Sequence, residues 1–554
     1  MFACIFGKAQ IFPQKNYDKG YFTWPVLAKK ALAANFGELR PNHYHMGLDC
    51  KTDQKENVPV VAAADGYIAK VKIEPFGFGR CIYINHPNGL TTLYAHLNDF
   101  YPELEKYIKE QQYGLESWKL FLENIPPNLF PVKKGQFIAY SGNTGGSQGP
   151  HLHFEIRDTK TDKVLNPLLF GFPITDNIAP AVLRLAVYDR TKSTYEQSPR
   201  FFPIKKVNGV YKTVSPVISI STSKVSFAIT AFDQYTGSTN QNGIYEADLY
   251  HNDQPVVGFQ LDSISYDETR YLNAHIDYKL RIGGGPFVQH LSRLPGYPPG
   301  TYKEVSGDGV LDISDGEPQH IKIDVKDTEG NTSAVEFDIK STGGSAYVQH
   351  DGPLFGPGYM NIFENDNLCF YLDEKELYDS VHFMISPYAA TTNRTAYLIH
   401  GGTVPAHTFY NIQLRNKNIV HPDRAVMKRW WGAKDDYVKA MPEGDGWYKG
   451  SFKAFGYIAL YEDDHPPTIT PVGFKDGMNA AKLSRLAFVI RDDTDELQNF
   501  RAELDGKWLR FSNDKGKTFI YKFDEYCPAG KHELKISVED IAGNKTEKVY
   551  NFTR

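Results

Sequence analysis

Residues 45–49 read His-Met-Gly-Leu-Asp, and residues 149–155 read Gly-Pro-His-Leu-His-Phe-Glu. In a β-strand, an even separation puts side chains on one face, so the His and Asp of the first stretch would share a face, and so would the two histidines of the second. A third histidine follows a strand-like run that ends in Tyr-Ala-His-Leu at residues 94–97. A lone His-x-His pair is weak evidence for a site, but the three elements together are specific. They predict a β-rich domain that gathers imidazole and carboxylate groups.

These motifs, and the segments that separate them, resemble the M23 (LytM/lysostaphin-type) zinc metallopeptidases. The separating segments that fit are Ala63–Gly66, Asn85–Gly89, Lys134–Gln136 and Ser141–Gly145. The resemblance covers roughly residues 20–170. It implies the β-fold of these peptidases for the N-terminal domain, together with a hydrolytic zinc centre.

The resemblance implies that zinc (Zn2+) is held by His45, Asp49 and His153. This donor set suits a catalytic zinc ion, because two neutral imidazoles and one carboxylate leave a fourth tetrahedral position open for water. Zinc polarises the scissile carbonyl and lowers the pKa of its water toward ~7. His96 and His151 would lie beside the metal as catalytic residues, one orienting or deprotonating the water and the pair stabilising the charged tetrahedral intermediate. Which histidine takes which part is left open.

Two further residues lie close to these motifs in the sequence. His43 would share a face with His45, but the spacing to Asp49 favours His45 as the ligand, so His43 is interpreted as a flanking residue. Glu155 would lie on the same strand face as the His-x-His pair. It is either a solvated or ion-paired carboxylate, or a group that supports the histidines in the site.

The rest of the N-terminal domain reads mainly as strands. Residues 58–71 contain two short strands around an Asp-Gly turn, and residues 81–94 form a hairpin whose Asn88-Gly89 turn accepts positive φ. Between residues 98 and 130 the composition shifts to Glu, Lys, Leu and Tyr, which predicts an amphipathic helical insertion. Such an insertion either shapes a substrate cleft or covers a strand edge, and the sequence leaves both open.

A weak internal repeat is visible after residue 175. Residues 323–331 and 536–544 share the pattern Ile-x-Val-x-Asp-x-x-Gly-Asn, and each Gly-Asn turn leads into a second strand. Residues 176–180 and 463–467 both place Asp four residues before Pro, ahead of an alternating apolar run. Because both segments begin and end with the same sequence patterns, we predict two copies of one Ig-like β-sandwich.

The predicted architecture is therefore mainly β, with an N-terminal M23 peptidase β-fold and two or three Ig-like β-sandwich domains after it. The peptidase domain occupies residues 11–174, with its helical insertion at 98–130. The downstream domains are a β-sandwich at 175–341, a third β-rich domain at 342–462 and a second β-sandwich at 463–554. This arrangement resembles Bacteroidetes-type proteins in which such sandwiches follow the peptidase.

Composition excludes several classes of protein. The 554-residue chain has a net charge of −5, which argues against a nucleic-acid binder built on a basic surface. A mean hydropathy of −0.44 and the lack of an apolar run of ~18 residues argue against a transmembrane helix. The five cysteines are too few for a disulfide scaffold, although a Cys50–Cys81 bridge stays possible.

The first ten residues are predicted to be the remnant of a signal peptide. Residues 1–6 are apolar and a short stretch with small residues follows them. The alternative is an ordinary first strand. We expect an exported protein, located in the periplasm, the cell envelope or the medium.

The resemblance leads to one main hypothesis and two alternatives. The main one is a secreted or periplasmic zinc metalloendopeptidase that hydrolyses peptide cross-links of bacterial peptidoglycan, with stem peptides as substrate and a possible protein partner at the Ig-like domains. The first alternative is a non-catalytic scaffold that binds the cell wall or the divisome. Scaffolds of this family typically lack metal ligands, and none is missing here. A biotinyl- or lipoyl-like carrier is disfavoured, because the sequence lacks the required lysine hairpin.

Overall fold

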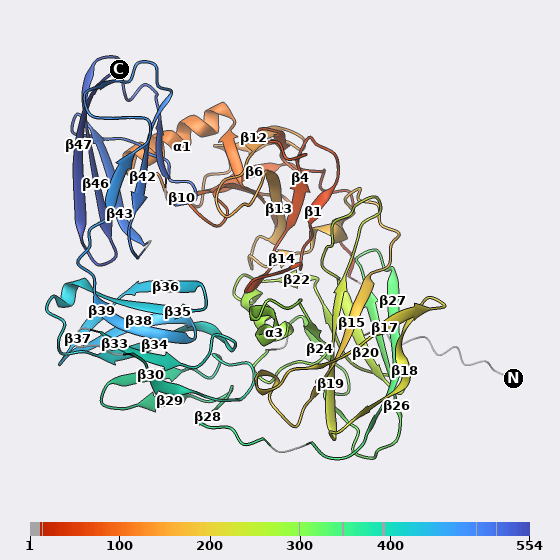
Figure 1. Ribbon diagram of the computed structural model, residues 1–554. Helices are drawn as coiled ribbons and strands as arrows, with labels where there is room; N and C mark the ends of the chain where they lie inside the picture. Colours follow the sequence, from red (N-terminus) through yellow and green to blue (C-terminus); the bar gives the residue numbers. More distant parts are fainter. Residues whose placement is uncertain are drawn as a thin grey trace.

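The computed structural model describes residues 11–554 except 14, 299, 346–347, 390–393, 495 and 517. Within these residues the chain is built mainly from β-strands (Figure 1), so the predicted mainly-β class is confirmed. The predicted signal-peptide remnant, residues 1–10, lies outside the described residues. Among the helices that the structure describes, none has the length and apolar character needed to cross a membrane.

The N-terminal domain is organised around an antiparallel sheet with the order β1-β4-β13-β8-β7-β6-β10. Its strands are β1 (Leu32–Ala34), β4 (Leu48–Lys51), β13 (His151–Asp158), β8 (Leu90–Ala95), β7 (Arg80–Asn85), β6 (Gly66–Ile73) and β10 (Leu120–Leu122). The apolar side chains of β13, Leu152, Phe154 and Ile156, belong to the hydrophobic core. Because side chains alternate along a strand, the intervening histidines and Glu155 lie on the opposite face.

Smaller elements complete this domain. They are the sheet of β5 (Pro59–Val61), β12 (Phe137–Ser141) and β9 (Leu97–Phe100), and the hairpin of β2 (Leu39–Arg40) and β3 (His43–Tyr44). The smaller sheet contributes Val60 and Ile138 to the same core. His96 separates β8 from β9, so its ring lies where the chain passes from the larger sheet to the smaller one.

The insertion predicted at residues 98–130 contains a helix and an edge strand. Helix α1 (Pro102–Gly114) begins with a proline, whose fixed φ suits the first turn, and it buries Leu104 and Ile108, one turn apart. Strand β10 then pairs with β6 in antiparallel register and covers the edge of the sheet. Of the two roles left open by the sequence, the structure shows edge coverage.

Helix α1 also contacts the C-terminal sandwich, which Figure 1 shows beside it. The rings of Tyr113 and Tyr526 stack with centroids 3.6 Å apart. Lys109 Nζ lies 2.7 Å from Asp524 Oδ2. The insertion in the N-terminal domain therefore contacts the C-terminal sandwich.

Segment 175–341 forms two packed sheets. The first comprises β16 (Arg200–Phe202), β15 (Ala181–Asp189), β19 (Lys224–Phe232) and β23 (Gln289–His290). The second comprises β17 (Ile204–Val207), β18 (Val210–Ile220), β27 (Thr332–Ser341), β26 (Gln319–Lys326), β20 (Glu246–His251), β21 (Gln254–Gln260) and β24 (Tyr302–Glu304). The rings of Phe227 and Phe337 meet between the sheets, 5.2 Å apart. Short helices α2 (Leu272–His275) and α3 (Tyr278–Ile282) lie between β21 and β23 in the sequence.

Segment 342–462 also forms two sheets. One comprises β29 (Asn361–Glu364), β30 (Leu368–Leu372), β34 (Pro405–Arg415), β38 (Trp447–Ala454) and β37 (Met441–Gly444). The other comprises β32 (Ile385–Pro387), β33 (Thr395–Ile399), β39 (Gly456–Glu462), β35 (Ala425–Trp431) and β36 (Lys434–Lys439). Ile412 of this segment and Phe227 of the preceding one belong to one hydrophobic cluster. The two segments thus share a continuous core, and the boundary placed between them stays a prediction.

Segment 463–554 is a smaller two-sheet unit. Its sheets comprise β40 (Thr468–Pro471), β42 (Arg485–Arg491) and β45 (Thr518–Lys522), and β41 (Met478–Asn479), β47 (Lys545–Thr553), β46 (Lys531–Asp540), β43 (Leu497–Leu504) and β44 (Lys507–Trp508). The rings of Phe500 and Phe519 stack between the two sheets, 3.8 Å apart. These contacts give the unit its own hydrophobic core.

The two repeat-bearing segments share topology as well as sequence. In each, the shared motif forms an antiparallel hairpin, β26–β27 or β46–β47. Gly330 and Gly543 take φ of 89° and 92° in these turns, a left-handed conformation that favours glycine. The last strand of each hairpin also pairs in parallel with an earlier strand, β18 or β41. The repeated sequence therefore accompanies a repeated strand arrangement.

The Cys50–Cys81 bridge considered from the sequence does not form. Both cysteines are free and buried. Cys50 lies in β4 and Cys81 in β7, with β13 and β8 between them in the sheet. Three strand spacings of ~4.8 Å separate the two backbones by roughly 14 Å, beyond the ~7 Å that a disulfide tolerates.

Candidate metal centre

The structure brings the five predicted site residues together on one face of the larger sheet. His153 on β13 lies directly opposite Asp49 on β4, and His151 lies opposite Lys51. His45 precedes β4 instead of lying on it, so the strand-face argument is wrong for the pair His45 and Asp49. The connecting loop nevertheless brings the His45 ring back to the carboxylate.

A glycine makes this close approach possible. A Cβ on Gly47 would lie 2.5 Å from the carbonyl oxygen of Phe154 and 2.9 Å from Cε1 of His153. A side chain at this position would therefore push the loop away from β13. This contact explains why the residue between the two ligand candidates that packs against β13, Gly47, has no side chain.

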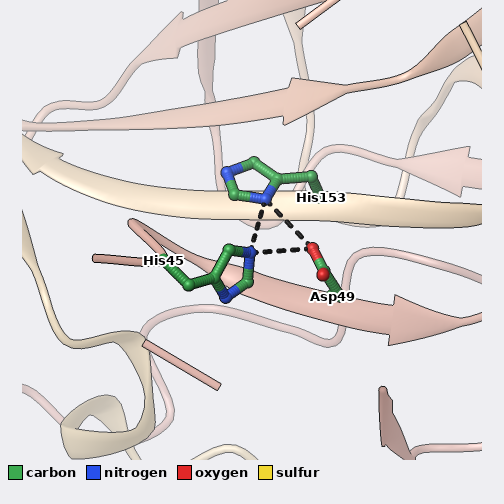
Figure 2. A group of neighbouring side chains, drawn as sticks. All are labelled: His45, Asp49 and His153. Atoms are coloured by element: carbon green, nitrogen blue, oxygen red, sulfur yellow. Dashed lines mark hydrogen bonds and ion pairs between the residues drawn. The ribbon is translucent and has the colours of Figure 1, made fainter. Parts of the chain in front are cut away.

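Three donor atoms converge at the centre of the cluster (Figure 2). His45 Nε2 lies 2.9 Å from Asp49 Oδ1, and His153 Nδ1 lies 3.1 Å from the same oxygen. The two imidazole nitrogens are 3.1 Å apart. The three residues are 7%, 9% and 6% exposed in chain order. This is a buried group with one ligand atom from each side chain, suited to holding a metal ion.

In His45 and His153, the ring nitrogen that points away from Asp49 already forms a hydrogen bond. His45 Nδ1 lies 2.7 Å from the carbonyl oxygen of Asn35, and His153 Nε2 lies 2.9 Å from Glu155 Oε1. A carbonyl or a carboxylate only accepts, so each histidine donates there and turns an unprotonated nitrogen toward Asp49. Carboxyl and carbonyl partners of this kind fix the tautomer of metal-binding histidines.

The charges at the centre call for a cation. Burial by itself would raise the pKa of Asp49, but His45, His151 and His153 hold it well below its usual range. Burial lowers the pKa of His153, whereas its hydrogen bonds to Asp49 and Glu155 raise it to about 9. Without a metal ion, the positive charge beside the Asp49 carboxylate is therefore a proton on His153; a metal ion would replace that proton and bind the lone pairs of both imidazoles.

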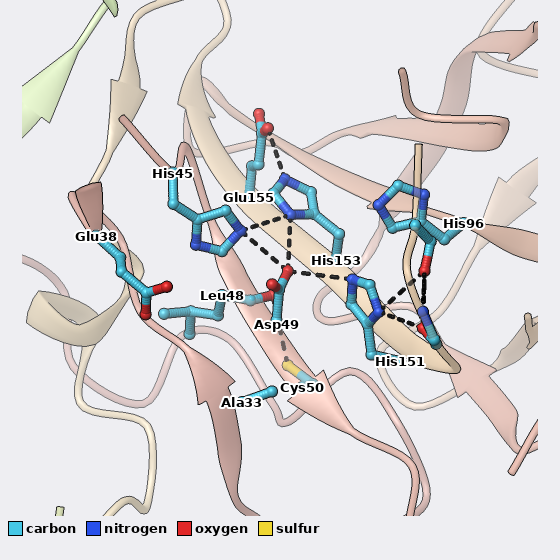
Figure 3. A network of polar contacts seen from close by, with 12 residues as sticks. Ala33, Glu38, His45, Leu48, Asp49, Cys50, His96, His151, His153 and Glu155 are labelled. Atoms are coloured by element: carbon cyan, nitrogen blue, oxygen red, sulfur yellow. Dashed lines mark hydrogen bonds and ion pairs between the residues drawn. The ribbon is translucent and has the colours of Figure 1, made fainter. Parts of the chain in front are cut away.

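Glu155 is fully buried and its carboxylate contacts His153 on the side away from Asp49 (Figure 3). Its Oε2 accepts from Arg157 Nε at 2.7 Å, and its Oε1 accepts from the Tyr266 hydroxyl at 2.5 Å. Burial would raise the pKa of Glu155, but Arg157 and His153 lower it to about 2. Of the alternatives left open by the sequence, solvation is wrong: the carboxylate is ion-paired and it holds the imidazole.

His151 and His96 stand beside the three donors. His151 Nε2 lies 3.3 Å from Asp49 Oδ1, and its Nδ1 donates to the carbonyl of Gly149 at 2.8 Å. The rings of His96 and His151 are 4.9 Å apart, and His96 Nδ1 donates to the carbonyl of Thr144 at 2.8 Å. Burial, followed by the two neighbouring imidazoles, lowers the pKa of His96 to about 3. His96 is therefore neutral at pH 7.

His96 also has an uncommon backbone conformation. Its φ is 60°, in the left-handed region that costs a non-glycine residue free energy. This conformation occurs at the step from β8 to β9 and aims the ring at the cluster. Strain of this kind is typical of functional positions.

Sequence reasoning missed two charged or polar neighbours of the centre. Arg40 Nη2 lies 3.3 Å from Asp49 Oδ2 and 3.1 Å from Glu38 Oε1, and Tyr266 reaches Glu155 from the following segment. Neither residue belongs to a motif, so no local pattern could identify it. Arg157 did carry a signal, because it continues the alternation of His151, His153 and Glu155 along one strand face.

His43 lies outside the cluster, as its interpretation as a flanking residue requires. It is exposed on β3, and its Nδ1 lies 2.9 Å from the carbonyl oxygen of Pro41. It makes no hydrogen bond to the three donors among the described residues. It is therefore a suitable control position for experiments on His45.

Comparison with known families identifies the N-terminal domain. Residues 43–113 and 130–167 match the sequence model of Peptidase family M23. The N-terminal domain is an M23 peptidase domain. The predicted family is thus confirmed, and the unmatched residues between the two ranges fall inside the predicted insertion. The Bacteroidetes-type arrangement of the domains after the M23 domain stays a prediction.

Curated relatives resemble the M23 domain and little else of the chain. An uncharacterized metalloprotease of Haemophilus influenzae is 31% identical over 172 residues, 29% of this chain and 30% of that protein. The DD-carboxypeptidase/endopeptidase Mpg of Neisseria meningitidis is 32% identical over 161 residues, 28% and 30% of the two chains. The cell division protein DipM of Caulobacter vibrioides is 30% identical over 145 residues, 26% and 19% of the two chains. The matches span under a third of each relative.

Solved structures include a zinc containing peptidase from Vibrio cholerae. It is 24% identical, with a TM-score of 0.21, over 28% of this chain and 41% of that one.

Proposed function

We propose that the protein is an exported zinc metalloendopeptidase that hydrolyses peptide cross-links of peptidoglycan. The carrying observation is the convergence of His45, Asp49 and His153 beside two further histidines. Two imidazoles and one carboxylate are the ligand type of catalytic zinc sites, which keep a position open for water. A relative named peptidoglycan DD-endopeptidase ShyA, from Vibrio cholerae, supports the choice of substrate.

The spacing of the donor atoms fits zinc. A tetrahedral ion with bonds of ~2.0 Å has ligand atoms roughly 3.3 Å apart. The three donor separations of 2.9, 3.1 and 3.1 Å are close to that value. His45, Asp49 and His153 would hold the ion, which when bound supplies Lewis acidity toward the scissile carbonyl and acidifies water.

His96 and His151 would carry out the proton transfers. Both donate from Nδ1 to a backbone carbonyl, so both present an unprotonated Nε2 to the site. A neutral imidazole in this tautomer accepts a proton from the attacking water. Once protonated, it donates a hydrogen bond to the oxyanion of the tetrahedral intermediate and then transfers that same proton to the leaving amine as the C–N bond breaks. His96 and His151 would share these steps.

Digestion of purified cross-linked peptidoglycan, with muropeptides analysed by mass spectrometry, tests this proposal. The zinc-loaded chain should remove cross-linked dimers and release free stem peptides. A zinc chelator and the His151→Ala variant should each abolish the change, whereas His43→Ala should cleave like the wild type. Cleavage by His151→Ala at the wild-type rate would contradict the mechanism.

A non-catalytic scaffold is the second candidate, favoured by the likeness to the cell division protein DipM. It predicts stoichiometric binding to peptidoglycan or a protein partner with an unchanged muropeptide profile. The same digestion therefore separates the two candidates, provided that zinc content is measured on the sample used.

A further inference from the structure

Each repeat-bearing sandwich gathers three aspartates at one end. In segment 175–341 they precede β15, follow β19 and follow β26; in segment 463–554 they precede β40, follow β42 and end β46. We name these the Asp176 cluster (Asp176, Asp233 and Asp327) and the Asp463 cluster (Asp463, Asp492 and Asp540). Within each cluster, one oxygen from every carboxylate lies within 4.8 Å of the others. The same arrangement thus occurs twice, at equivalent places in one topology.

The shared Asp-x-x-Gly-Asn motif explains how the third aspartate is held. Asp327 Oδ1 accepts from the Asn331 backbone N–H at 2.9 Å, and its Oδ2 accepts from Asn331 Nδ2 at 2.7 Å. Asp540 makes the same two contacts with Asn544, at 2.9 and 3.0 Å. The asparagine side chain also donates to the backbone carbonyl of the first aspartate, at 3.4 Å from Asn331 and 3.0 Å from Asn544.

The first aspartate is also held identically in both clusters. Asp176 Oδ1 accepts from the backbone N–H of Ile178 at 3.0 Å, and Asp463 Oδ1 accepts from that of His465 at 3.1 Å. Each contact fixes one oxygen of the carboxylate to its own loop. The other oxygen, Oδ2 of Asp176 or of Asp463, is buried without a hydrogen-bond partner.

Several carboxylate oxygens of the two clusters are buried without a hydrogen-bond partner. They are Oδ2 of Asp176, Oδ1 of Asp233, Oδ2 of Asp463 and Oδ1 of Asp492. Asp176, Asp233 and Asp463 are 8%, 2% and 3% exposed. Burying several carboxylates together without a partner is costly, so the cluster either takes up protons or binds a cation whose positive charge balances the carboxylates.

Protein side chains do not supply that charge. Within the described part of the chain, the charged groups that act on the pKa of Asp176 and of Asp233 are other carboxylates, and no lysine, arginine or histidine is among them. At the other cluster, exposed His465 lies 3.9 Å from Asp463 and closer to Asp493, at 3.4 Å.

Lys439 lies near the Asp463 cluster, and its charge interacts through space with Asp540 and Asp463. Its Nζ donates to the backbone carbonyl of Ala542 at 2.8 Å instead of to a carboxylate of the cluster.

The pKa directions agree with this geometry. Burial, with the neighbouring Asp176 and Asp327 adding to it, raises the pKa of Asp233 to about 8. Burial also raises the pKa of Asp176 and of Asp463 to about 6.

We propose that the Asp176 cluster and the Asp463 cluster each bind a calcium ion. The three side-chain donors of each cluster are carboxylate oxygens, which favour hard divalent cations. They provide no nitrogen donors of the kind that the histidine centre offers to zinc. Ca²⁺ suits loops better than Mg²⁺, because it accepts six to eight oxygens in irregular geometry. Backbone carbonyls and water would complete the coordination. Each ion would link the segment that leads into a sandwich to the ends of two strands of that sandwich.

Calorimetric titration of the full-length chain with Ca²⁺ tests the proposal. The chain is first stripped with chelator and its histidine centre reloaded with zinc, so that the titration reports on other sites. Two Ca²⁺ per chain are expected. Asp233→Asn should remove one and Asp492→Asn the other. Asp253→Asn, which changes an exposed carboxylate in the β20–β21 turn, should leave both.

Thermal unfolding separates a cation site from a merely structural cluster. Ca²⁺ should raise the wild-type Tm by ~5 °C, and less in either variant. Without Ca²⁺, Asp233→Asn should unfold no earlier than the wild type at pH 7, because the raised pKa of Asp233 keeps its carboxyl group mostly protonated and the amide resembles that neutral form. A cluster that serves only through its hydrogen bonds would lose stability on this substitution in both conditions.

The titration of the wild type decides the matter even if a variant fails to fold. No binding at millimolar Ca²⁺ would overturn the proposal. A stoichiometry of one, lost in only one variant, would overturn it for the other sandwich. Equal affinity for Mg²⁺ would overturn the choice of calcium.

Discussion

The histidine centre of the M23 domain and the Asp176 cluster are both buried groups of polar side chains, yet they are completed differently. At the histidine centre, His45 and His153 are fixed from behind by Asn35 and Glu155, and Arg40 pairs with the carboxylate. In the Asp176 cluster, Asn331 fixes one aspartate, and buried carboxylate oxygens are left without partners. In both, outer contacts orient the donors. Under the two proposals the donor atoms would then select the ion: nitrogen with oxygen for zinc, oxygen alone for calcium.

The largest expected effect is loss of zinc when a ligand is changed. Asp49→Asn replaces the negative donor, so we expect bound zinc to fall from one ion per chain to near zero and hydrolysis to fall to background. Calcium binding at the sandwiches should persist, since none of its donors is touched. Metal analysis of dialysed protein measures both ions.

The matched control for this substitution is His43→Ala, which changes an exposed histidine two residues from His45. It should keep one zinc ion per chain. If Asp49→Asn also kept its zinc, the assignment of the ligands would be wrong, and the distinction between the two kinds of cluster would fail with it.

A smaller effect is expected from the groups behind His153. Glu155→Gln weakens the hydrogen bond that orients the imidazole, so zinc affinity should fall by ~10–100-fold. This change also leaves Arg157 without its full partner, so Tyr266→Phe is the milder variant and should weaken zinc binding less. Competition with a chromophoric chelator measures both affinities. Unchanged affinity in Glu155→Gln would show that the carboxylate serves folding alone.

The sequence predicted what lies within one strand or one turn. The alternation of His151, His153 and Glu155 on β13 placed these side chains on one face, and the repeated Asp-x-x-Gly-Asn pattern marked the two hairpins. Period-two alternation and positive-φ glycine turns are local properties, so a single sequence reveals them.

Contacts between segments that are distant in the chain could not be predicted from the sequence. Tyr266 reaches Glu155 across 111 residues, and Asp233 joins Asp176 and Asp327 only because β19 and β26, which belong to different sheets, end at the same end of the sandwich. Likewise His45 was assigned to a strand, whereas a loop carries it to Asp49. Each of these depends on tertiary packing, which has no signature in neighbouring residues.

A further expected effect, on the pH dependence of stability, concerns two buried histidines without a carboxylate partner. Whereas Asp49 and Glu155 raise the pKa of His153, burial lowers that of His275 to about 4 and that of His290 to about 3. Their folded-state pKa lies below the unfolded value of ~6.5, so the unfolded chain binds more protons in between. Stability should therefore fall as the pH drops from 6.5 toward 4, by up to ~1.4 kcal/mol per pH unit for each histidine.

Thermal unfolding at a series of pH values, in constant salt and with both metals chelated, measures this slope. His275→Gln keeps a hydrogen-bonding side chain without the titrating ring, so its Tm should fall less steeply with acid than that of the wild type. The control is His251→Gln, at a half-buried histidine near the β20–β21 turn, which should leave the slope unchanged. Identical slopes in all three chains would mean that carboxylate protonation governs the acid response. The contrast between partnered and unpartnered histidines would then have no thermodynamic consequence.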